Sequence, residues 1–271
     1  MRDIRRYAIH AFAYSDVGRV RRTNEDSFIL ADLTKGIGIE KNGVFKFESG
    51  PRGALFAVAD GMGGAAAGEM ASRLGLEAVY NEVLENSAID QESDSEALDQ
   101  ALIDAVGIAN RRIFDLSRSN QDFAGMGTTL TAVLEMQGKL VIAQVGDSRA
   151  YLIRDQNICQ LTRDQSLVAQ MVSNGTLTED QARRHPERNI LLQALGVNPT
   201  VELSLRSGTV HPDDIILLCS DGLHAQMSSE EIFDIIMDSS NEKDACMGLV
   251  SLANDRGGPD NITAVLIQFI S

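Results

Sequence analysis

Four aspartates in the sequence lie where a strand-like apolar run ends or is about to begin. The aspartates are Asp60, Asp147, Asp221 and Asp260, and the runs are 55–59, 140–145, 215–219 and 262–270. Buried strands that stop at a carboxylate can direct several acids to one point at the edge of a sheet. Clustered carboxylates raise one another's pKa unless a cation neutralises them. Ligand sets made only of oxygen are typical of Mg²⁺ or Mn²⁺ sites, so the pattern indicates a metal site.

An ordinary turn is the alternative at each of these positions. Asp-Gly is a common turn pair, because aspartate bonds its own backbone and glycine accepts a positive φ. Near the N-terminus, Glu25 and Asp26 add two acids, although they are also compatible with the polar start of a strand. Four such turns together with this acidic pair favour a shared site over coincidence.

The size and charge of the chain limit the class of protein. It has 271 residues, of which 44% are hydrophobic, which is enough for one large domain core. A net charge of −15 argues against nucleic-acid binding, because an acidic body repels phosphate backbones. No apolar stretch reaches the ~20 residues of a membrane helix. The three cysteines are far apart and fit reduced thiols, so we expect a cytoplasmic protein without membrane insertion.

Hydrophobic periodicity predicts a mixed fold. We expect strands at 8–14, 27–31, 55–59, 128–136, 139–145, 150–154, 215–219 and 262–270, and helices at 68–85, 93–116, 228–238 and 242–254. Capping boxes begin two of the helices, at Ser93 and Ser228. A tight turn at Gln137-Gly138 joins two of the strands. This order of elements favours an α+β fold with antiparallel sheets over a βαβ repeat.

Two segments interrupt this pattern. Residues 34–52 are rich in Gly and Lys and contain a short alternation at 44–47, which predicts an exposed hairpin. Residues 164–198 form an irregular insert with short helical pieces, one of which starts at Thr178-x-x-Gln181. An insert of this length inside a compact domain is usually functional or mobile.

Six short motifs occur in a fixed order between residues 15 and 261. They are Ser15-Asp16-Val17-Gly18 with Arg21-x-x-Asn24-Glu25-Asp26, Val58-Ala59-Asp60-Gly61-Met62-Gly63-Gly64, Gly127-Thr128-Thr129, Val145-Gly146-Asp147-Ser148-Arg149, Leu218-Cys219-Ser220-Asp221-Gly222 and Gly257-Gly258-Pro259-Asp260-Asn261. In these motifs the chain resembles the metal-dependent protein phosphatases, the type 2C serine/threonine phosphatases, in their bacterial form. A single motif of this kind would be weak evidence, but six in order across nearly the whole chain are specific.

The resemblance implies a fold and a metal centre. The fold is a four-layer sandwich of two antiparallel β-sheets flanked by α-helix pairs, forming one catalytic domain over residues 1–271. The centre holds two Mn²⁺ or Mg²⁺ ions at one edge. By this resemblance, Asp60 would bridge both ions, the Gly61 carbonyl would bind one of them, and Asp221 and Asp260 would bind the other. Glu25 and Asp26 would bind through water, and Asn261 would orient Asp260 or a metal-bound water. Arg21 would hold the substrate phosphate.

This implied centre suits the hydrolysis of phosphoserine and phosphothreonine. A phosphate monoester dianion repels hydroxide, and two divalent ions neutralise that charge while lowering the pKa of a bridging water. The resulting hydroxide attacks phosphorus directly, so no phosphoenzyme forms. Arginine suits the phosphate because its planar fork bonds two oxygens at once. Asp147 either belongs to the outer part of this centre or is a hairpin acid that bonds backbone amides.

The chain departs from the family pattern at three places. Ala65-Ala66-Ala67 follows the Asp60 motif, where many bacterial members have a histidine. Gly125 stands where some members have an acid linked to a third metal, which leaves Asp122, Asp147 or Asp221 as possible ligands of a third ion. Gln165 replaces the histidine of a family Asp-His-Ser pattern. The acids of the two-metal site are all present, so we expect an active enzyme.

The insert at 164–198 corresponds to the family's flap beside the active site. Within it, His185 and Arg188 are positioned in sequence to reach a phosphopeptide, although a solvated loop explains them equally well. Phosphorylated proteins are the expected substrates, and a bacterial Ser/Thr kinase the expected opposing partner, by family analogy. We expect a monomer. Two other roles stay open: a weak enzyme that acts as a phosphoprotein-binding sensor, and a phosphatase dedicated to one regulator.

Overall fold

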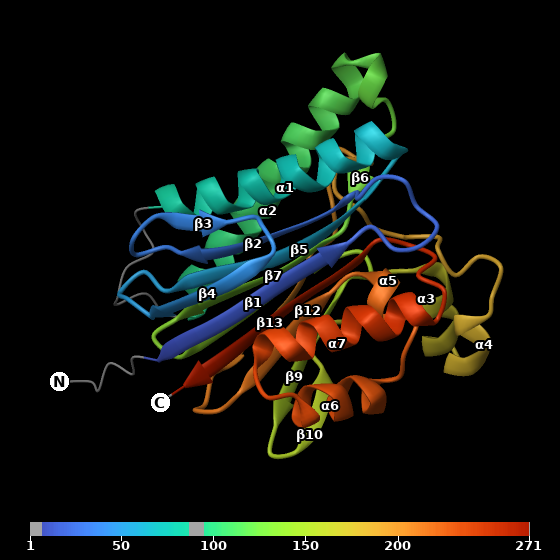
Figure 1. The fold of residues 1–271 in the computed structure, drawn as a ribbon. Helices are drawn as coiled ribbons and strands as arrows, with labels where there is room; N and C mark the ends of the chain where they lie inside the picture. The colour runs from blue at the N-terminus through green and yellow to red at the C-terminus, as the bar shows by residue number, and fades with distance from the viewer. Residues whose placement is uncertain (1–6, 87–94, 271) are drawn as a thin grey trace.

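The computed structural model describes residues 7–86 and 95–270, which form two antiparallel sheets packed face to face (Figure 1). The first sheet has the strand order β10 (Asn157–Gln160), β9 (Arg149–Arg154), β12 (Ile215–Cys219), β13 (Ile262–Ile270), β1 (Ala8–Asp16) and β4 (Gly43–Glu48). The second has the order β11 (Ser204–Thr209), β8 (Lys139–Val145), β7 (Leu130–Met136), β5 (Ala54–Met62), β2 (Asp26–Asp32) and β3 (Ile37–Ile39), with β6 (Gly127–Thr128) beside β5.

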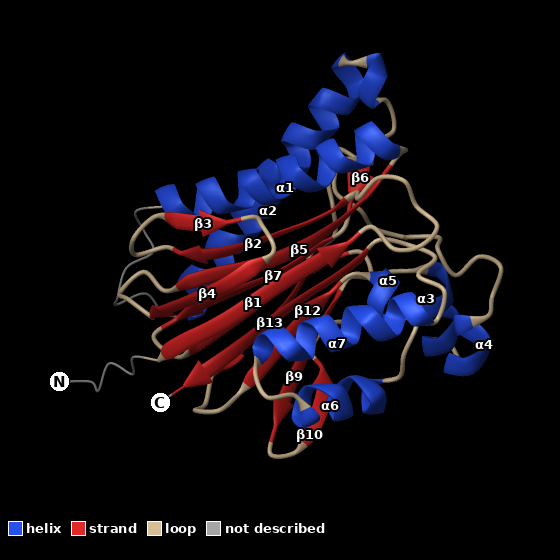
Figure 2. Ribbon diagram, in the orientation of Figure 1, coloured by secondary structure: helices blue, strands red, loops and turns tan. Residues whose placement is uncertain are grey.

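A pair of helices covers the outer face of each sheet (Figure 2). The long helices α1 (Ala65–Glu85) and α2 (Ser95–Ser119) pack on the second sheet, over β2, β5 and β8. The other pair, α6 (Ser229–Asp238) and α7 (Glu242–Asp255), lies on the first sheet, with α7 against β1 and β13. The predicted four-layer α+β sandwich is therefore confirmed.

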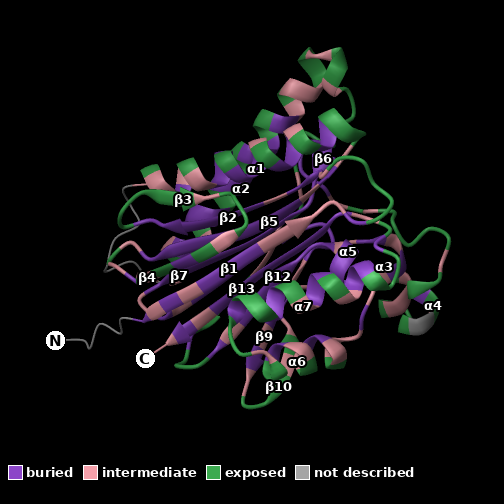
Figure 3. Ribbon diagram, in the orientation of Figure 1, coloured by how far each residue is buried: buried purple, intermediate pink, exposed green. Residues whose placement is uncertain are grey.

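Three apolar layers hold this sandwich together, and they explain why the strands appear in the sequence as continuous apolar runs (Figure 3). Successive side chains of a strand point to opposite faces of the sheet. In β5, Leu55 and Ala57 pack under α1 and α2, whereas Phe56 and Val58 pack against the other sheet. Because both faces of each sheet are covered, β5 and β13 carry apolar side chains on both.

Local sequence signals set several of the element boundaries. Capping boxes form at Ser228, before α6, and at Thr178, before α4 (Glu179–Arg183). The turn at Gln137-Gly138 has φ values of 54° and 81°, the left-handed pair that a two-residue hairpin of this kind requires. The predicted cap at Ser93 lies outside the described residues.

The predicted hairpin at 34–52 is wrong. The two strands of this segment belong to different sheets: β3 pairs with β2, and β4 pairs with β1. The segment therefore crosses from one sheet to the other. Phe45 of β4 is buried between the sheets, and this burial explains the alternating sequence pattern at 44–47.

The insert at 164–198 contains α3 (Leu167–Ser173) and α4, and both its ends are fixed. Ser166 and Leu191 face each other as an isolated β-bridge at the base of the projecting part. Further along, Leu195 is fully buried and exchanges backbone hydrogen bonds of 2.8 and 3.1 Å with Thr128. Only the stretch between 167 and 190 projects, toward the side of α5 (Asp221–His224) in Figure 1. No helix among the described residues is long and apolar enough to cross a membrane.

Candidate active site

Asp26 and Asp60 meet across two neighbouring strands. The register of β2 and β5 places them directly opposite each other, so their side chains leave the same face of the sheet. The backbone of Asp60 is held by two buried threonines. Its N–H donates to Thr129 Oγ1 at 2.9 Å, and its carbonyl accepts from Thr129 N and Thr128 Oγ1, each at 2.9 Å. These threonines therefore fix the turn that carries the aspartate.

Asp221 and Asp260 are brought together by a close contact between two backbones. Asp221 is the first residue of the short helix α5, which directly follows β12. A Cβ atom at Gly222 would overlap the backbone carbonyl of Asn261, so only glycine lets α5 approach the loop before β13 this closely. This contact places the acids that follow β12 and precede β13 at one edge of the sandwich.

The carboxylate of Asp26 is held by hydroxyl groups on one oxygen only. Ser220 and Thr263 donate to Asp26 Oδ2 at 2.6 and 2.7 Å. The other oxygen, Oδ1, is buried without a hydrogen-bond partner, as is Oδ1 of Asp221. Buried carboxylate oxygens without a donor are costly, and an ion is one of the few groups that satisfies them.

The acids raise one another's pKa. Burial, followed by the charges of Asp26 and Asp221, holds the pKa of Asp60 well above its usual range. Burial and the charge of Asp221 do the same for Asp147. Burial raises the pKa of Asp26 to about 7, and burial with the charge of Asp260 raises the pKa of Asp221 to about 6. At neutral pH the cluster therefore favours a cation or a proton.

Arg21 provides the positive charge nearest to Asp260. Its Nη2 donates to Asp260 Oδ2 at 2.8 Å, and its side chain is about half exposed at 48%. The hydrogen bond and the charge of Asp260 raise the pKa of Arg21. Arg21 thus lies between the acids and solvent, where an incoming anion would meet it.

The side-chain amide of Asn261 binds backbone rather than a carboxylate. Its Oδ1 accepts from the N–H of Glu25 at 2.8 Å, and its Nδ2 donates to the carbonyls of Val17 and Thr23, each at 2.9 Å. Asn261 therefore fastens the loop that carries Arg21 to the start of β13. Its own N–H, not its side chain, donates to Asp260, at 2.9 Å.

Gly61 and Glu25 are held against helix α1. The N–H of Gly61 donates to the Glu25 carbonyl at 3.1 Å, and a Cβ at Gly61 would overlap the carbonyl of Gly68. A Cβ at Gly68 would in turn overlap the carboxylate of Glu25. Burial raises the pKa of Glu25, although the charge of Arg21 opposes this shift. The two glycines thus let the helix lie close to the acids.

Asp147 occupies a turn that two other segments clamp. His224 of α5 donates through Nε2 to the Asp147 carbonyl at 3.0 Å. Gln165 accepts from Gly146 N through Oε1 at 2.8 Å, and its own N–H donates to the Gly146 carbonyl at 2.9 Å. Burial lowers the pKa of His224 to about 3, so this histidine is neutral at neutral pH.

Three other predicted residues lie away from the acids. Asp122 is exposed in a short 3-10 helix, η1 (Gln121–Phe123), which packs on α1 and α2. Arg188 is exposed on the insert, and His185 accepts from the N–H of Glu187 in its own loop at 3.2 Å. The structure therefore gives none of these three a contact with the carboxylate cluster.

The donor set fits hard divalent cations. All the candidate ligands are oxygen atoms, the cluster is strongly negative, and two buried carboxylate oxygens lack partners. Among residues 7–86 and 95–270, no three His, Cys, Asp or Glu side chains already converge as a ready-made metal site. The carboxylate of Asp260 pairs instead with Arg21.

The hydroxyl groups that hold Asp26 were not predicted from the sequence. Ser220 and Thr263 donate to Asp26 from two segments that are distant in the sequence, and Ser15, from a third segment, lies with its Oγ 2.7 Å from Thr263 Oγ1. The pairing of Ser15 with Thr263 follows from the register of β1 and β13. The register of β1 and β13 would have identified this pair of hydroxyl groups, but the sequence motifs alone do not show it.

Comparison with known proteins gives the same family from sequence and from structure. The family model described as "Protein phosphatase 2C" matches residues 44–247. The serine/threonine phosphatase Stp of Listeria monocytogenes (serotype 4b) is 36% identical over 260 residues, covering 96% of each chain. The phosphatase PstP of Mycobacterium tuberculosis is 36% identical over 258 residues, covering 95% of this chain and 44% of that protein.

Comparison with solved structures points to the same family as the sequence comparison. The crystal structure of M. tuberculosis PstP/Ppp has a TM-score of 0.80 at 34% identity and covers 97% of this chain and all of that one. The Streptococcus agalactiae serine/threonine phosphatase has a TM-score of 0.83 at 30% identity, with the same coverage. A structure of the PstP catalytic domain in complex with two manganese ions has a TM-score of 0.77 at 33% identity, covering 98% of this chain and all of that one.

We expect Asp60→Asn to stabilise the metal-free protein. The raised pKa of Asp60 means that its ionised form opposes folding, so the wild type loses stability as pH rises above the ordinary aspartate pKa of about 4. At pH 7.5 in chelator, the variant should melt ~3 °C or more above the wild type, the shift that about 1 kcal/mol produces in a chain of this size. At pH 5 the difference should shrink. Differential scanning calorimetry measures both.

The matched control is Asp234→Asn, which changes an exposed acid on α6. It should not alter the melting temperature of the metal-free protein. An Asp60→Asn variant that melts below the wild type at pH 7.5 would contradict this expectation. It would show that the charge of Asp60 is already neutralised within the protein, so that the other acids do not repel it.

Proposed function

The chain belongs to the protein phosphatase 2C family, and we propose that the carboxylate cluster around Asp60 is its catalytic centre. The activity is that of a metal-dependent protein serine/threonine phosphatase, which hydrolyses phosphoserine and phosphothreonine. The observation that supports the location is the meeting of Asp26, Asp60 and Asp221, whose pKa values are raised, at one sandwich edge where two buried carboxylate oxygens have no partner. Asp260 lies at the same edge.

In this proposal the acids hold two ions, Mn²⁺ or Mg²⁺. Asp60 and the Gly61 carbonyl, with Asp221 and Asp260, are the direct ligands, and Glu25, Asp26 and Asp147 act through water. When bound, such an ion pair neutralises the phosphate charge and lowers the pKa of a water molecule. Asn261 is a positioning residue, because its amide is fully engaged with three backbone groups. Asp122 would need a movement of η1 to contribute to a third ion.

Arg21 binds the substrate phosphate in this proposal. Its ion-pair partner among the described residues is Asp260, and its half-exposed guanidinium can rotate from that carboxylate to an incoming phosphate. Arginine gains most from such an exchange because its planar fork bonds two phosphate oxygens at once. Arg21 therefore shields Asp260 without substrate and orients the ester when substrate arrives.

A protonated histidine is not available as an acid at the cluster. Among the described residues, the histidine that touches the cluster is His224, whose pKa of about 3 keeps it neutral, and its Nε2 proton is committed to the Asp147 carbonyl. Ala65-Ala66-Ala67 open helix α1 at the place where many bacterial members of the family have a histidine. Protonation of the leaving serine or threonine oxygen must therefore come from water or from one of the acids.

The cellular setting is also a proposal. Phosphorylated proteins are the substrates, as the serine/threonine phosphatase names of the bacterial relatives suggest. A bacterial Ser/Thr kinase is the opposing partner by family analogy. We further propose a monomeric, cytoplasmic enzyme in which residues 1–271 form one catalytic domain. The complete set of acids favours turnover over a role as a phosphoprotein sensor.

We expect turnover of p-nitrophenyl phosphate to require added Mn²⁺ or Mg²⁺ and to stop in EDTA. Asp221→Asn and Asp260→Asn should each lower kcat by roughly a hundredfold or more, the scale seen when one group that stabilises transition-state charge is lost. Isothermal titration with Mn²⁺ should show weaker binding in both variants. Full activity in chelator, with no metal by elemental analysis, would remove the metal-dependent mechanism.

We expect Arg21→Ala to raise KM for a phosphopeptide about tenfold and to lower kcat less, because the metals also hold the phosphate. Steady-state kinetics separates the two parameters. Arg22→Ala is the matched control, since Arg22 is an exposed neighbour of the same charge. If Arg22→Ala were the damaging change and Arg21→Ala harmless, the assignment at this motif would be wrong by one residue.

We expect the insert to select substrates. Because Ser166 and Leu191 are adjacent at its base, residues 168–189 can be replaced by a four-residue Gly-Ser turn. The ratio of kcat/KM for a phosphoprotein to that for p-nitrophenyl phosphate should fall, since only a large substrate can use contacts far from the reacting group. Double substitution of His185 and Arg188 by alanine tests whether these two residues carry the effect. An unchanged ratio in a folded, metal-loaded enzyme would show that the insert is only a surface loop and does not select substrates.

A further inference from the structure

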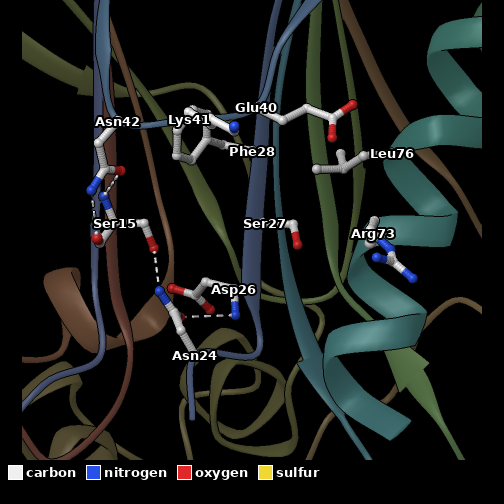
Figure 4. A pocket seen from close by; sticks show the side chains of 10 residues that line it. All are labelled: Ser15, Asn24, Asp26, Ser27, Phe28, Glu40, Lys41, Asn42, Arg73 and Leu76. Carbon is white, nitrogen blue, oxygen red and sulfur yellow. Dashed lines mark hydrogen bonds between the residues drawn. The ribbon is translucent and has the colours of Figure 1, made fainter. Parts of the chain in front are cut away.

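A hollow of about 490 Å³ lies at the free edge of β2, next to the catalytic cluster (Figure 4). Its lining includes Asp26 and Phe28 of β2, Lys41 and Asn42 of the β3–β4 connection, and Arg73 of α1. Asp26 belongs both to this hollow and to the acid cluster. The hollow therefore adjoins the acid cluster at Asp26 and is not lined by the candidate metal ligands Asp60, Asp221 and Asp260.

The hollow exists because β3 is too short to cover β2. β3 pairs only with Leu30–Asp32, and the chain then turns away toward the other sheet. Asn42 fixes this departure: its Oδ1 accepts from Ser15 N at 2.9 Å, and its Nδ2 donates to the Ser15 carbonyl at 3.0 Å. The edge of β2 from Asp26 to Phe28 consequently has no neighbouring strand among the described residues.

The uncovered edge presents backbone hydrogen-bonding groups. The odd-numbered positions bond β5, because Leu33 N donates to the Gly53 carbonyl and Gly61 N donates to the Glu25 carbonyl, each at 3.1 Å. Since antiparallel ladders alternate, the N–H and C=O of Phe28 point the other way, into the hollow. Asn24 Oδ1 accepts from the N–H of Asp26 on that same side, at 3.2 Å. Phe28 thus offers an unused donor and acceptor to an added strand.

We propose that this hollow binds an extended segment of the phosphoprotein substrate, which adds a short strand to the free edge of β2. The inference rests on the proposed function, because the segment is the one next to the phosphorylated residue. Phe28 lies two residues, about 7 Å, along β2 from Asp26 of the cluster. A substrate residue two or three positions from the phosphoresidue therefore reaches Phe28, by the mode of recognition known as β-strand addition.

The charge of the hollow favours an acidic side chain in that segment. Lys41 and Arg73 are both exposed, and Figure 4 shows them on opposite sides of Ser27. Asp26 and Glu40 also line the hollow, so its lining carries two acids and two cations. Arg73 also lies 3.9 Å from Glu77 of its own helix, which leaves Lys41 as the cation without a neighbouring helical acid. An acidic residue flanking the phosphoresidue would meet Lys41 or Arg73.

The first test is an N-methyl scan of a nine-residue phosphothreonine peptide with acidic flanks. N-methylation removes one backbone donor at a time and keeps every side chain. On one flank, alternate positions should raise KM about five- to tenfold and their neighbours should not, because alternate residues of a strand face the edge partner. A uniform effect, or none on either flank, would overturn strand addition.

The second test compares Lys41→Glu with Lys46→Glu. Both change an exposed lysine on the same stretch of chain, but Lys46 lies on β4, outside the hollow. Lys41→Glu should lower the ratio of kcat/KM for the peptide to that for p-nitrophenyl phosphate about fivefold, and Lys46→Glu should not. Equal effects of the two variants would overturn the charge assignment.

A binding measurement separates this inference from the proposed function. A non-hydrolysable phosphonate peptide should slow amide hydrogen exchange at Phe28 of the metal-loaded enzyme, and its fully N-methylated flank analogue should not. Unchanged exchange in an enzyme that still hydrolyses p-nitrophenyl phosphate would overturn the docking site alone. Loss of metal-dependent hydrolysis for every substrate would instead overturn the proposed function.

Discussion

Asp26 and Asp60 face each other across two paired strands, with Asp147 and Asp221 close enough to raise the pKa of Asp60 further. Such an arrangement opposes folding in the absence of a cation, because each ionised carboxylate has lost water and gained a like charge. The surrounding structure must therefore hold the acids in place against their repulsion. Most of the features around the cluster can be understood as means of doing so.

Backbone contacts provide most of that rigidity. Two threonines hold Asp60, glycines at 61, 68 and 222 let helices and loops approach without a side chain between them, and Asn261 joins the Arg21 loop to β13. Backbone contacts of this kind do not depend on the protonation state of the acids. The centre can therefore keep its shape while its charge changes, which is what binding an ion requires of it. The cost in stability is typical of functional sites.

The sequence alone predicted those features that depend on a single strand or turn. The aspartates at strand ends were visible because both faces of β5, β8 and β12 are buried, so each strand stands out as an apolar run that stops abruptly. The capping boxes at Thr178 and Ser228 were visible for the same local reason. By contrast, β11 was missed because it is a largely exposed edge strand with a polar composition.

Features that depend on pairing between distant segments could not be predicted in this way. The support of Asp26 by Ser220 and Thr263 joins residues about two hundred positions apart, and only the register of the sheets reveals it. The same limitation explains the error at 34–52, where two short strands that look like a hairpin join different sheets. Resemblance to a family identified the acids, but it did not show what holds them.

Some segments around the centre hold the acids in place and others do not. This difference separates a rigid centre from the segments beside it. The cluster takes its supports from β2, β5, β12, β13 and α1, so a change in any of these would disturb the acids directly. The insert between residues 167 and 190 and the β3–β4 connection contribute no direct support to Asp26, Asp60, Asp221 or Asp260. The insert follows Gln165, which bonds the Gly146 turn, and the β3–β4 connection lies at the free edge of β2. In our proposals, substrate choice depends on these two segments, whereas the chemistry depends on the candidate metal ligands.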